Sequence, residues 1–513
     1  MKLARTASAI IVGVDAHIID VEAHLADGLV GTAITGLADT AVNESRDRVR
    51  AAVSSTGFGW PQQRITIGLS PAWLPKRGSA LDLAIALAVL AADGRLDPEQ
   101  LRRALVVGEL GLDGSVRAVR GVLPMALAAQ QWGFSRIIVP TANASEASLV
   151  PELELLAVGS LGHALRLLGV ECVTGDEGDP DAGPDATASE VKDLSDVRGQ
   201  LGAKTALEVA AAGGHHLALL GPPGVGKTLL AERLPTILPP LSDEAALEVT
   251  AVQSVLMDHP LRLQRRPPFA APHHGASASA VIGGGAMGNP KVGLVTAAHR
   301  GVLFLDEAPE FAINVLEALR QPLESGRVTI ARAGFLIAMP ARFQLVIAAN
   351  PCPCGHAFDT AGRCRCAPQQ RRRYLGRISG PLLDRIDVRV LVEAPSPGDV
   401  ALGASISGES SAVVAERVLM ARERQRARLR GTPWQTNAEV PGPVLRKRWE
   451  LPHAAREFFN AELTKAVSES VRGIDRTLRL AWTCADLQEH DAPTREDLLA
   501  AMRLRDAGGR WPA

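Results

Sequence analysis

The 513-residue sequence predicts an α/β protein in three parts. Residues 1–172 alternate strand-like and helical runs, which indicates a first α/β domain. Residues 191–392 place a glycine-rich loop between an apolar strand and a helix, which indicates a nucleotide-binding core on a parallel sheet. Residues 393–513 have a helical pattern, and the acidic, Pro- and Gly-rich stretch 173–190 predicts a flexible linker.

The elements of the first domain follow from apolar runs bounded by polar and glycine-rich stretches. We expect strands over 9–14, 32–37, 64–69 and 136–139, and helices over 79–92 and 123–132. The whole chain is too long for one ordinary core, and its length suggests about three domains.

The most informative segment is 215–228, HHLALLGPPGVGKT, where an apolar strand leads into Gly-x₄-Gly-Lys-Thr. Glycines let successive backbone N–H groups face the phosphates of a nucleotide, and the next helix presents its N-terminus. The lysine neutralises phosphate charge, and the threonine hydroxyl suits Mg²⁺. We therefore expect ATP and Mg²⁺ to bind at Gly221, Pro222, Pro223, Gly224, Val225, Gly226, Lys227 and Thr228.

Two further apolar strands end in groups that suit the same site. The run 301–305 leads into Asp306 and Glu307, and the run 343–349 leads to Asn350. At the carboxyl ends of parallel strands these side chains would gather beside the phosphates. We expect Asp306 to bind Mg²⁺, Glu307 to polarise the attacking water and Asn350 to orient it.

The order of these motifs resembles that of the AAA+ ATPases. Residues 378–387, ISGPLLDRID, look like the arginine-finger segment of the Mg-chelatase and MCM branch, with Arg385 as a finger supplied to a neighbouring subunit. In 471–479, VRGIDRTLR, the resemblance makes Arg472 the sensor-2 arginine of the lid, with Arg476 as the second choice. The alternative is that both segments carry ordinary surface arginines.

Several stretches resemble one family of that branch, the Mg-chelatase-like ComM/YifB proteins, and together they cover essentially the whole chain. They are residues 199–200, 210–215, 268–274, 283–285, 299–310, 350–355, 364–366 and 377–387. The resemblance implies a homohexameric ATPase ring that acts on single-stranded or branched DNA as a branch-migration helicase. Thr205 and Trp482 depart from the family, because basic residues are expected there.

Two alternatives to a DNA motor stay open. The chain could be the motor of a metal chelatase, although chelatase motors as a family are expected to lack the first domain and the cysteine cluster described below. It could also remodel proteins, or use ATP binding as a switch with little hydrolysis. Glu307 argues against the switch, because a binding switch does not need that carboxylate.

The first domain resembles the C-terminal fold of Lon protease, which uses a Ser–Lys dyad. Residues 75–80, PKRGSA, match the turn that carries the serine, but an ungapped alignment puts Ala80 in its place. Leu123 stands where the lysine is expected, and Ser79 has no adjacent base to activate it. We therefore expect a scaffold or partner surface, not a protease.

Four cysteines follow the Asn350 strand in the spacing C-x-C-x₉-C-x-C. Four thiolates can close a tetrahedral Zn²⁺ site, although structural zinc usually uses C-x₂₋₄-C pairs. The alternatives are a structural Zn²⁺ site, reduced free thiols and a redox switch. The residues concerned are Cys352, Cys354, Cys364 and Cys366.

Two features predict contacts with DNA phosphates. The segment 324–336 resembles the pre-sensor-1 hairpin that faces the pore of hexameric motors, with Arg332 at its tip. The segment 363–377 is rich in arginine and contains no acid, as is typical of phosphate contacts. A third basic segment, 422–430, is expected to be a solvated helix face. The expected DNA contacts are Arg332, Arg371, Arg372 and Arg373.

The composition limits which other classes of protein this chain can belong to. A net charge of −1 gives no overall attraction to nucleic acid, so any DNA contact must be local. Six cysteines in so long a chain are not a secreted disulfide framework, and no apolar run reaches the ~20 residues of a membrane span. We expect a cytoplasmic protein.

Overall fold

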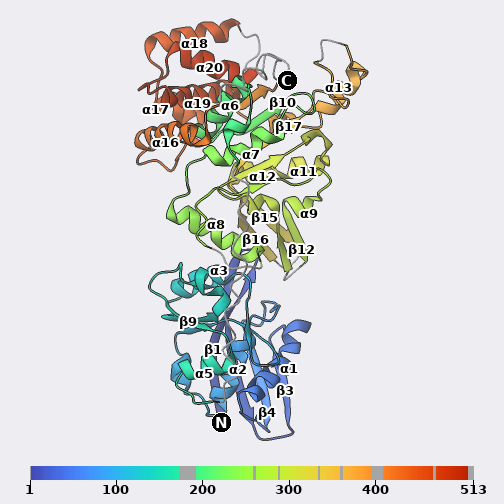
Figure 1. Ribbon diagram of the computed structural model, residues 1–513, viewed down its shortest axis with the longest axis vertical. Helices are drawn as coiled ribbons and strands as arrows, with labels where there is room; N and C mark the ends of the chain where they lie inside the picture. Colours follow the sequence, from blue (N-terminus) through green and yellow to red (C-terminus); the bar gives the residue numbers. More distant parts are fainter. Residues whose placement is uncertain are drawn as a thin grey trace.

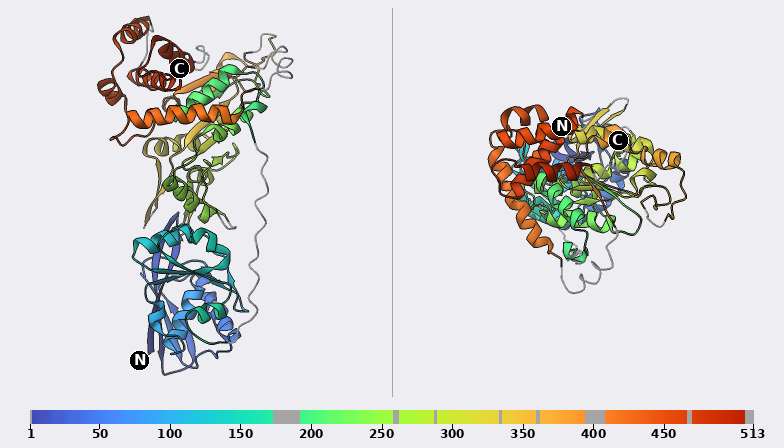
Figure 2. Two further views of the ribbon diagram at one scale, coloured as in Figure 1. Left: turned by 60° about the vertical axis from the view of Figure 1, so that its left-hand side comes forward. Right: turned by 90° about the horizontal axis from the view of Figure 1, so that it is seen from above.

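The computed structural model describes residues 2–172, 192–257, 262–286, 289–332, 335–358, 362–393, 408–465 and 470–506. The predicted linker 173–190 lies outside these residues. The molecule is elongated, with the N-terminal sheet at one end, a second sheet in the middle and the C-terminal helices at the other end (Figures 1 and 2). Among the described residues, no helix combines the length and the apolarity that crossing a membrane requires.

The N-terminal sheet has seven strands in the order β3-β4-β2-β1-β5-β8-β9. Its members are β1 (Lys2–Val12), β2 (Asp15–Ala26), β3 (Gly31–Thr35), β4 (Arg64–Ser70), β5 (Ala104–Val106), β8 (Arg136–Pro140) and β9 (Glu154–Val158). A separate small hairpin joins β6 (Glu109–Leu110) and β7 (Val116–Arg117). The four predicted strands are confirmed with shifted ends, whereas β2, β5 and β9 were missed.

Helices cover both faces of this sheet. One face packs against α1 (Thr40–Ser55), α2 (Asp82–Ala92) and α5 (Leu161–Leu167), and α2 is buried along its whole length. The other face packs against α3 (Val122–Gln131) and α4 (Ala144–Ala147). The two predicted helices, 79–92 and 123–132, correspond to α2 and α3.

The central sheet is parallel, with the strand order β11-β14-β17-β10-β18. Successive residues of each strand enter two different cores: Leu217 and Leu219 pack on one face and Ala218 and Leu220 on the other. A strand buried on both faces needs apolar residues throughout, which explains the continuous runs in the sequence. The strands are β10 (Leu217–Leu220), β11 (Phe269–Ala270), β14 (Val302–Leu305), β17 (Gln344–Ala349) and β18 (Val388–Leu391).

Helices and two small strands surround the central sheet. One face carries α6 (Leu201–Gly213) and α7 (Lys227–Ile237), and the remaining pieces connect the strands or extend toward the N-terminal sheet. These pieces are α8 (Asp243–Leu256), α9 (Ala278–Val281), β12 (Gly283–Ala286), β13 (Asn289–Val292), α10 (Leu294–Ala297), α11 (Ile313–Ala318), α12 (Arg320–Ser325), α13 (Pro368–Leu375) and α14 (Gly380–Leu383).

The predicted hairpin is present as β15 (Arg327–Arg332) and β16 (Phe335–Pro340), paired antiparallel. Arg332 is the last residue of β15, but its side chain lies outside the described part of the structure. The turn after β1 packs beneath this hairpin, where Val14 is buried in the same core as Met339. Beside it, the N–H of Gly121 donates to Ser254 O of α8 at 2.8 Å. The N-terminal sheet therefore contacts both α8 and the hairpin.

The C-terminal segment is helical, as predicted. It contains α16 (Ser411–Arg428), α17 (Gly442–Arg448), α18 (His453–Lys465), α19 (Val471–Leu487) and α20 (Arg495–Asp506), which gather at one end of the molecule (Figure 2). Buried His215 ties this segment to the sheet: its Nδ1 lies 2.8 Å from Asp387 Oδ2, and its Nε2 lies 2.8 Å from Thr483 Oγ1 of α19.

The prediction of a solvated face for 422–430 is wrong at two positions. Arg422 donates two hydrogen bonds to Ala211 O of α6, at 3.1 and 2.7 Å. Arg428 pairs with Asp486 and lies 4.4 Å from the ring centre of Trp482. These arginines satisfy buried acceptors between helices, which periodicity alone does not reveal.

Candidate functional site

The glycine-rich loop joins β10 to α7 at the carboxyl edge of the central sheet. Gly224 and Gly226 adopt left-handed backbone angles, with φ of +78° and +89°, which residues with a Cβ rarely tolerate. Helix α7 begins at Lys227, immediately after this turn. The loop amides and the helix N-terminus are the groups that bind phosphate in this arrangement.

Lys227 and Asn350 meet in this loop. The Lys227 ammonium donates to Gly221 O at 2.8 Å, to Pro222 O at 2.7 Å and to Asn350 Oδ1 at 3.0 Å. Burial lowers the pKa of Lys227, while Asp306 and Glu307 oppose that shift. The structure thus places the predicted sensor amide in contact with the predicted phosphate-binding lysine.

The donor set beside the loop suits Mg²⁺. Thr228 Oγ1 donates to Asp306 Oδ2 at 2.6 Å, which brings together one hydroxyl and one carboxylate oxygen, the hard ligands that Mg²⁺ prefers. Glu307, the next residue, has a left-handed φ of +50°, and its N–H donates to Asp306 Oδ1 at 2.9 Å. All five predicted groups at this edge therefore converge: Lys227, Thr228, Asp306, Glu307 and Asn350.

Arg385 lies at the opposite edge of the same sheet. Strands β10 and β18 run parallel in the register Leu217 to Val388 and Leu220 to Leu391. The glycine-rich loop follows the end of β10, whereas Arg385 precedes the start of β18. Arg385 pairs with Glu324, and its Nε has no hydrogen-bond partner among the described residues.

The predicted lid arginines lie beside Arg385. Arg476 donates to Asp384 Oδ1 at 3.0 Å, and Arg472 is 75% exposed with its Nη1 3.9 Å from Asp384 Oδ2. Burial, Arg320 and Arg472 lower the pKa of Arg385. A cavity of about 380 Å³ opens here, and its lining includes His216, Arg385, Arg472, Arg476 and Arg479.

Comparison with known proteins identifies the family. Family models match residues 193–400 (Magnesium chelatase, subunit ChlI), 21–143 (Subunit ChlI of Mg-chelatase) and 408–505 (Magnesium chelatase, subunit ChlI C-terminal). An uncharacterized protein of Mycobacterium tuberculosis is 48% identical over 99% of this chain and 100% of its own. The uncharacterized protein YifB of Salmonella typhimurium is 42% identical over 98% of this chain and 97% of its own. The competence protein ComM of Haemophilus influenzae is 41% identical over 98% of each.

The chain belongs to the Mg-chelatase-like ComM/YifB family. It is therefore an AAA+ ATPase, for which ATP and Mg²⁺ are the substrate and cofactor, in agreement with the residues at the carboxyl edge.

Two residues of this ComM/YifB site were not predicted as functional. His274 Nδ1 lies 3.5 Å from Glu307 Oε2, so the loop after β11 reaches the predicted general base. The Gln200 amide donates to Val225 O and so holds the glycine-rich loop from the start of α6. Both stand in stretches that carried the family resemblance, which was the only signal in the sequence that could have found them.

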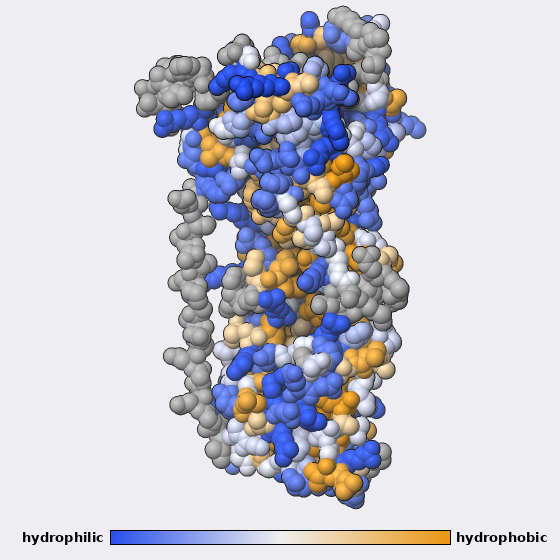
Figure 3. All heavy atoms as spheres, turned by 90° about the vertical axis from the view of Figure 1, so that its right-hand side faces the viewer, coloured by the Kyte–Doolittle hydropathy of each residue, from blue (hydrophilic) through white to orange (hydrophobic). Residues whose placement is uncertain are grey.

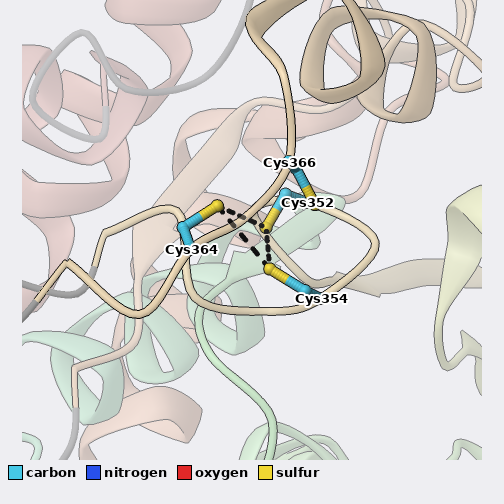
Figure 4. A group of neighbouring side chains, drawn as sticks. All are labelled: Cys352, Cys354, Cys364 and Cys366. Carbon is cyan, nitrogen blue, oxygen red and sulfur yellow. Dashed lines mark hydrogen bonds between the residues drawn. The ribbon is translucent and has the colours of Figure 1, made fainter.

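The four cysteines of the ComM/YifB chain form one cluster (Figure 4). Cys352 Sγ lies 3.3 Å from Cys354 Sγ and 3.7 Å from Cys364 Sγ, and Cys354 Sγ lies 3.6 Å from Cys364 Sγ. All four sulfur atoms, including that of Cys366, lie within 4.8 Å of one another. The two C-x-C pairs therefore meet, as the zinc alternative requires.

The predicted DNA arginines that follow the cluster lie on α13, which projects from the side of the central sheet (Figure 1). Arg372 and Arg373 are exposed, whereas Arg371 is half-buried and donates to Cys366 O at 3.1 Å. Figure 3 views the molecule from the side on which α13 projects: hydrophilic residues dominate that end, and hydrophobic residues reach the surface nearer the middle.

Proposed function

We propose that this protein is a ring-forming motor that uses ATP hydrolysis to move DNA strands, as a branch-migration helicase on recombination intermediates. The observation that carries the motor part is the separation of two sets of groups. The ATP-binding residues lie at one edge of the central sheet and Arg385 lies at the other. One chain thus carries half of each of two catalytic sites.

Each residue at the carboxyl edge has a distinct task. Lys227 and the loop amides bind the phosphates of ATP, and Thr228 and Asp306 would hold Mg²⁺, which neutralises phosphate charge when bound. Glu307 accepts a proton from the attacking water, and Asn350 orients that water. His274 positions the carboxylate of Glu307.

The arginines at the other edge act on the next subunit. Arg385 and the exposed Arg472 line a cavity to which the chain's own glycine-rich loop contributes no residue. In a closed ring the same pair of edges meets at every interface, so each ATP site gains its arginines from a neighbour. We propose a homohexamer, with Arg385 as finger and Arg472 as sensor.

Three observations support DNA as the substrate. The exposed arginines of α13 suit a phosphate backbone, and the β15–β16 hairpin places Arg332 at the end of a strand. The relative ComM is named a competence protein. We propose that Arg332, Arg371, Arg372 and Arg373 contact DNA.

The remaining assignments complete the proposal. The domain limits are 1–172, 191–392 and 393–513 with the linker 173–190, and the compartment is the cytoplasm. The first domain is a scaffold or partner surface, because Ala80 and the buried Leu123 stand at the dyad positions of Lon protease. The expectation that Ser79 has no adjacent base is wrong, since its hydroxyl donates to the carboxylate of Glu109, but the lysine of the dyad is still missing. The four thiols bind a structural Zn²⁺ ion in addition to the Mg²⁺ of the ATP site.

A second candidate is the motor of a metal chelatase, which the descriptions of the matching family models favour. The model that matches 21–143 is itself described as a chelatase subunit, so the first domain does not argue against this candidate. The cysteine cluster remains the feature that distinguishes a DNA motor of the ComM/YifB family from a chelatase motor.

Unwinding of a four-way DNA junction tests the proposal directly. The full-length protein with ATP should separate the junction arms, and Lys227→Ala should not. ATPase activity that DNA neither stimulates nor requires, with no junction remodelled, would refute the DNA motor and favour chelatase or protein remodelling.

A further inference from the structure

The geometry of the cysteine cluster fits a single tetrahedral metal ion. Four sulfurs bound at about 2.3 Å to one Zn²⁺ lie about 3.8 Å apart. The observed separations of 3.3, 3.6 and 3.7 Å are close to this value and far from the ~2.05 Å of a disulfide. The side chains point toward a common centre from two separate turns of the chain (Figure 4). The chemistry is that of a structural zinc site, as proposed above.

On one side the cluster abuts the ATP site. Cys352 is buried two residues beyond Asn350, the amide that contacts Lys227. The N–H of Gly355 donates to Cys352 O at 2.9 Å, and a Cβ on Gly355 would lie 2.4 Å from Pro223 Cδ of the glycine-rich loop. The turn that carries the first two thiols is therefore packed directly on the phosphate-binding loop.

On the other side the cluster leads into α13. Cys366 stands two residues before this helix, and Arg371 donates from the helix to Cys366 O at 3.1 Å. Tyr374, in the last turn, is buried in the core of the sheet, while Arg372 and Arg373 face outward. The arginines of α13 proposed to meet DNA thus lie within about two helical turns of the second thiol pair.

We propose that Zn²⁺ bound by the four cysteines couples the ATP site to α13, the helix that carries the exposed arginines. The metal joins the turn packed on Pro223 to the segment that begins α13, so that DNA contact at α13 alters ATP binding and hydrolysis. Without the metal, weak sulfur contacts of Cys364 with Cys352 and Cys354, at 3.7 and 3.6 Å, take the place of four metal–thiolate bonds. This inference rests on the proposed ATPase and DNA functions.

The test compares four full-length proteins: wild type, Cys364→Ser, Gly355→Ala and, as a matched control, Cys172→Ser, whose thiol lies outside the cluster. Each is measured for bound metal, for KM and kcat of ATP hydrolysis, and for stimulation by a four-way DNA junction. Exchange of the bound metal for Co²⁺ adds a spectroscopic signature, because tetrahedral thiolate–cobalt has strong charge-transfer absorption.

We expect one zinc per wild-type chain and the charge-transfer bands after exchange. Cys364→Ser should lose both, together with stimulation of the ATPase by DNA. Gly355→Ala should keep zinc and raise KM for ATP roughly tenfold, because its new methyl group displaces the loop at Pro223. Cys172→Ser should match wild type.

Each contrary result overturns a different part of the proposal. Iron, or no bound metal and no cobalt bands, in the wild type would overturn the zinc link. A metal-free Cys364→Ser with unchanged DNA stimulation, or an unchanged KM in Gly355→Ala, would overturn the coupling while leaving the metal site. If Cys364→Ser does not fold, removal of zinc from the wild type with a chelator decides, because retained stimulation by the junction would overturn the coupling. A zinc-containing wild type without ATPase activity would overturn the proposed function, and the coupling with it.

Discussion

Mixing two inactive variants tests whether Arg385 completes the ATP site of a neighbouring subunit. Lys227→Ala removes the phosphate-binding ammonium but keeps Arg385, and Arg385→Ala does the reverse. If the two edges of the sheet serve different ATP sites, a mixed ring contains interfaces at which both groups are intact. If Arg385 served its own chain's ATP, no subunit in the mixture would be complete.

The distance between the two edges of the sheet sets how much ATPase activity Arg385→Ala should lose. Strand β10 has four residues, so it separates the two edges by about 13 Å. At an effective dielectric of about 20, unit charges at that distance interact by about 1.3 kcal/mol, roughly tenfold in rate. An arginine in contact with the transferred phosphate is worth ~10³–10⁵. A loss beyond about a hundredfold in Arg385→Ala therefore indicates direct contact, which the chain's own geometry does not allow.

The assay is steady-state ATPase activity after equal amounts of the two variants are dissociated and reassembled. Random mixing leaves about one interface in four with both groups intact, so about a quarter of wild-type activity should return. The double variant Lys227→Ala/Arg385→Ala, mixed with either single variant, is the control and should restore none. Mixed rings that form, as shown by co-purification of two tags, yet remain inactive would refute the argument.

Three further predictions concern the ATP site and the DNA surface. His274→Ala should lower kcat about tenfold with little change in KM, because the general base loses its positioning contact, whereas its neighbour His273→Ala should not; equal kcat values for the two variants would contradict this. Gln200→Ala should raise the Kd of ATP, measured by calorimetry, about tenfold, because the loop loses a hydrogen bond from α6; an unchanged Kd would show that the loop holds without it. Replacing Arg372 and Arg373 by Gln should reduce the slope of log Kd for DNA against log salt by roughly 2, and an unaltered slope would mean that these arginines do not meet phosphate.

Sequence reasoning succeeded where the signal is local. The strand–loop–helix around Lys227 and the apolar strands before Asp306 and Asn350 are encoded by contiguous residues, and the structure places all three as expected. The short strands β5 and β9 and the polar strand β2 escaped notice. Strands as short as β5 and β9 have too few residues to show a clear period of their own. In β2, by contrast, apolar and polar residues alternate from Ile19 to Leu25, so a local signal for this strand is present in the sequence.

The sequence by itself determined that the chain has an ATP-binding loop on a parallel sheet, because glycines, apolar runs and strand-end acids act through their immediate neighbours. Only the tertiary structure decided where the other groups meet. The parallel pairing of β10 with β18 puts Arg385 at the edge away from Lys227, and the packing of α19 brings Arg472 beside it. Long-range packing likewise brings His274 to Glu307, because the loop that carries it belongs to an adjacent strand.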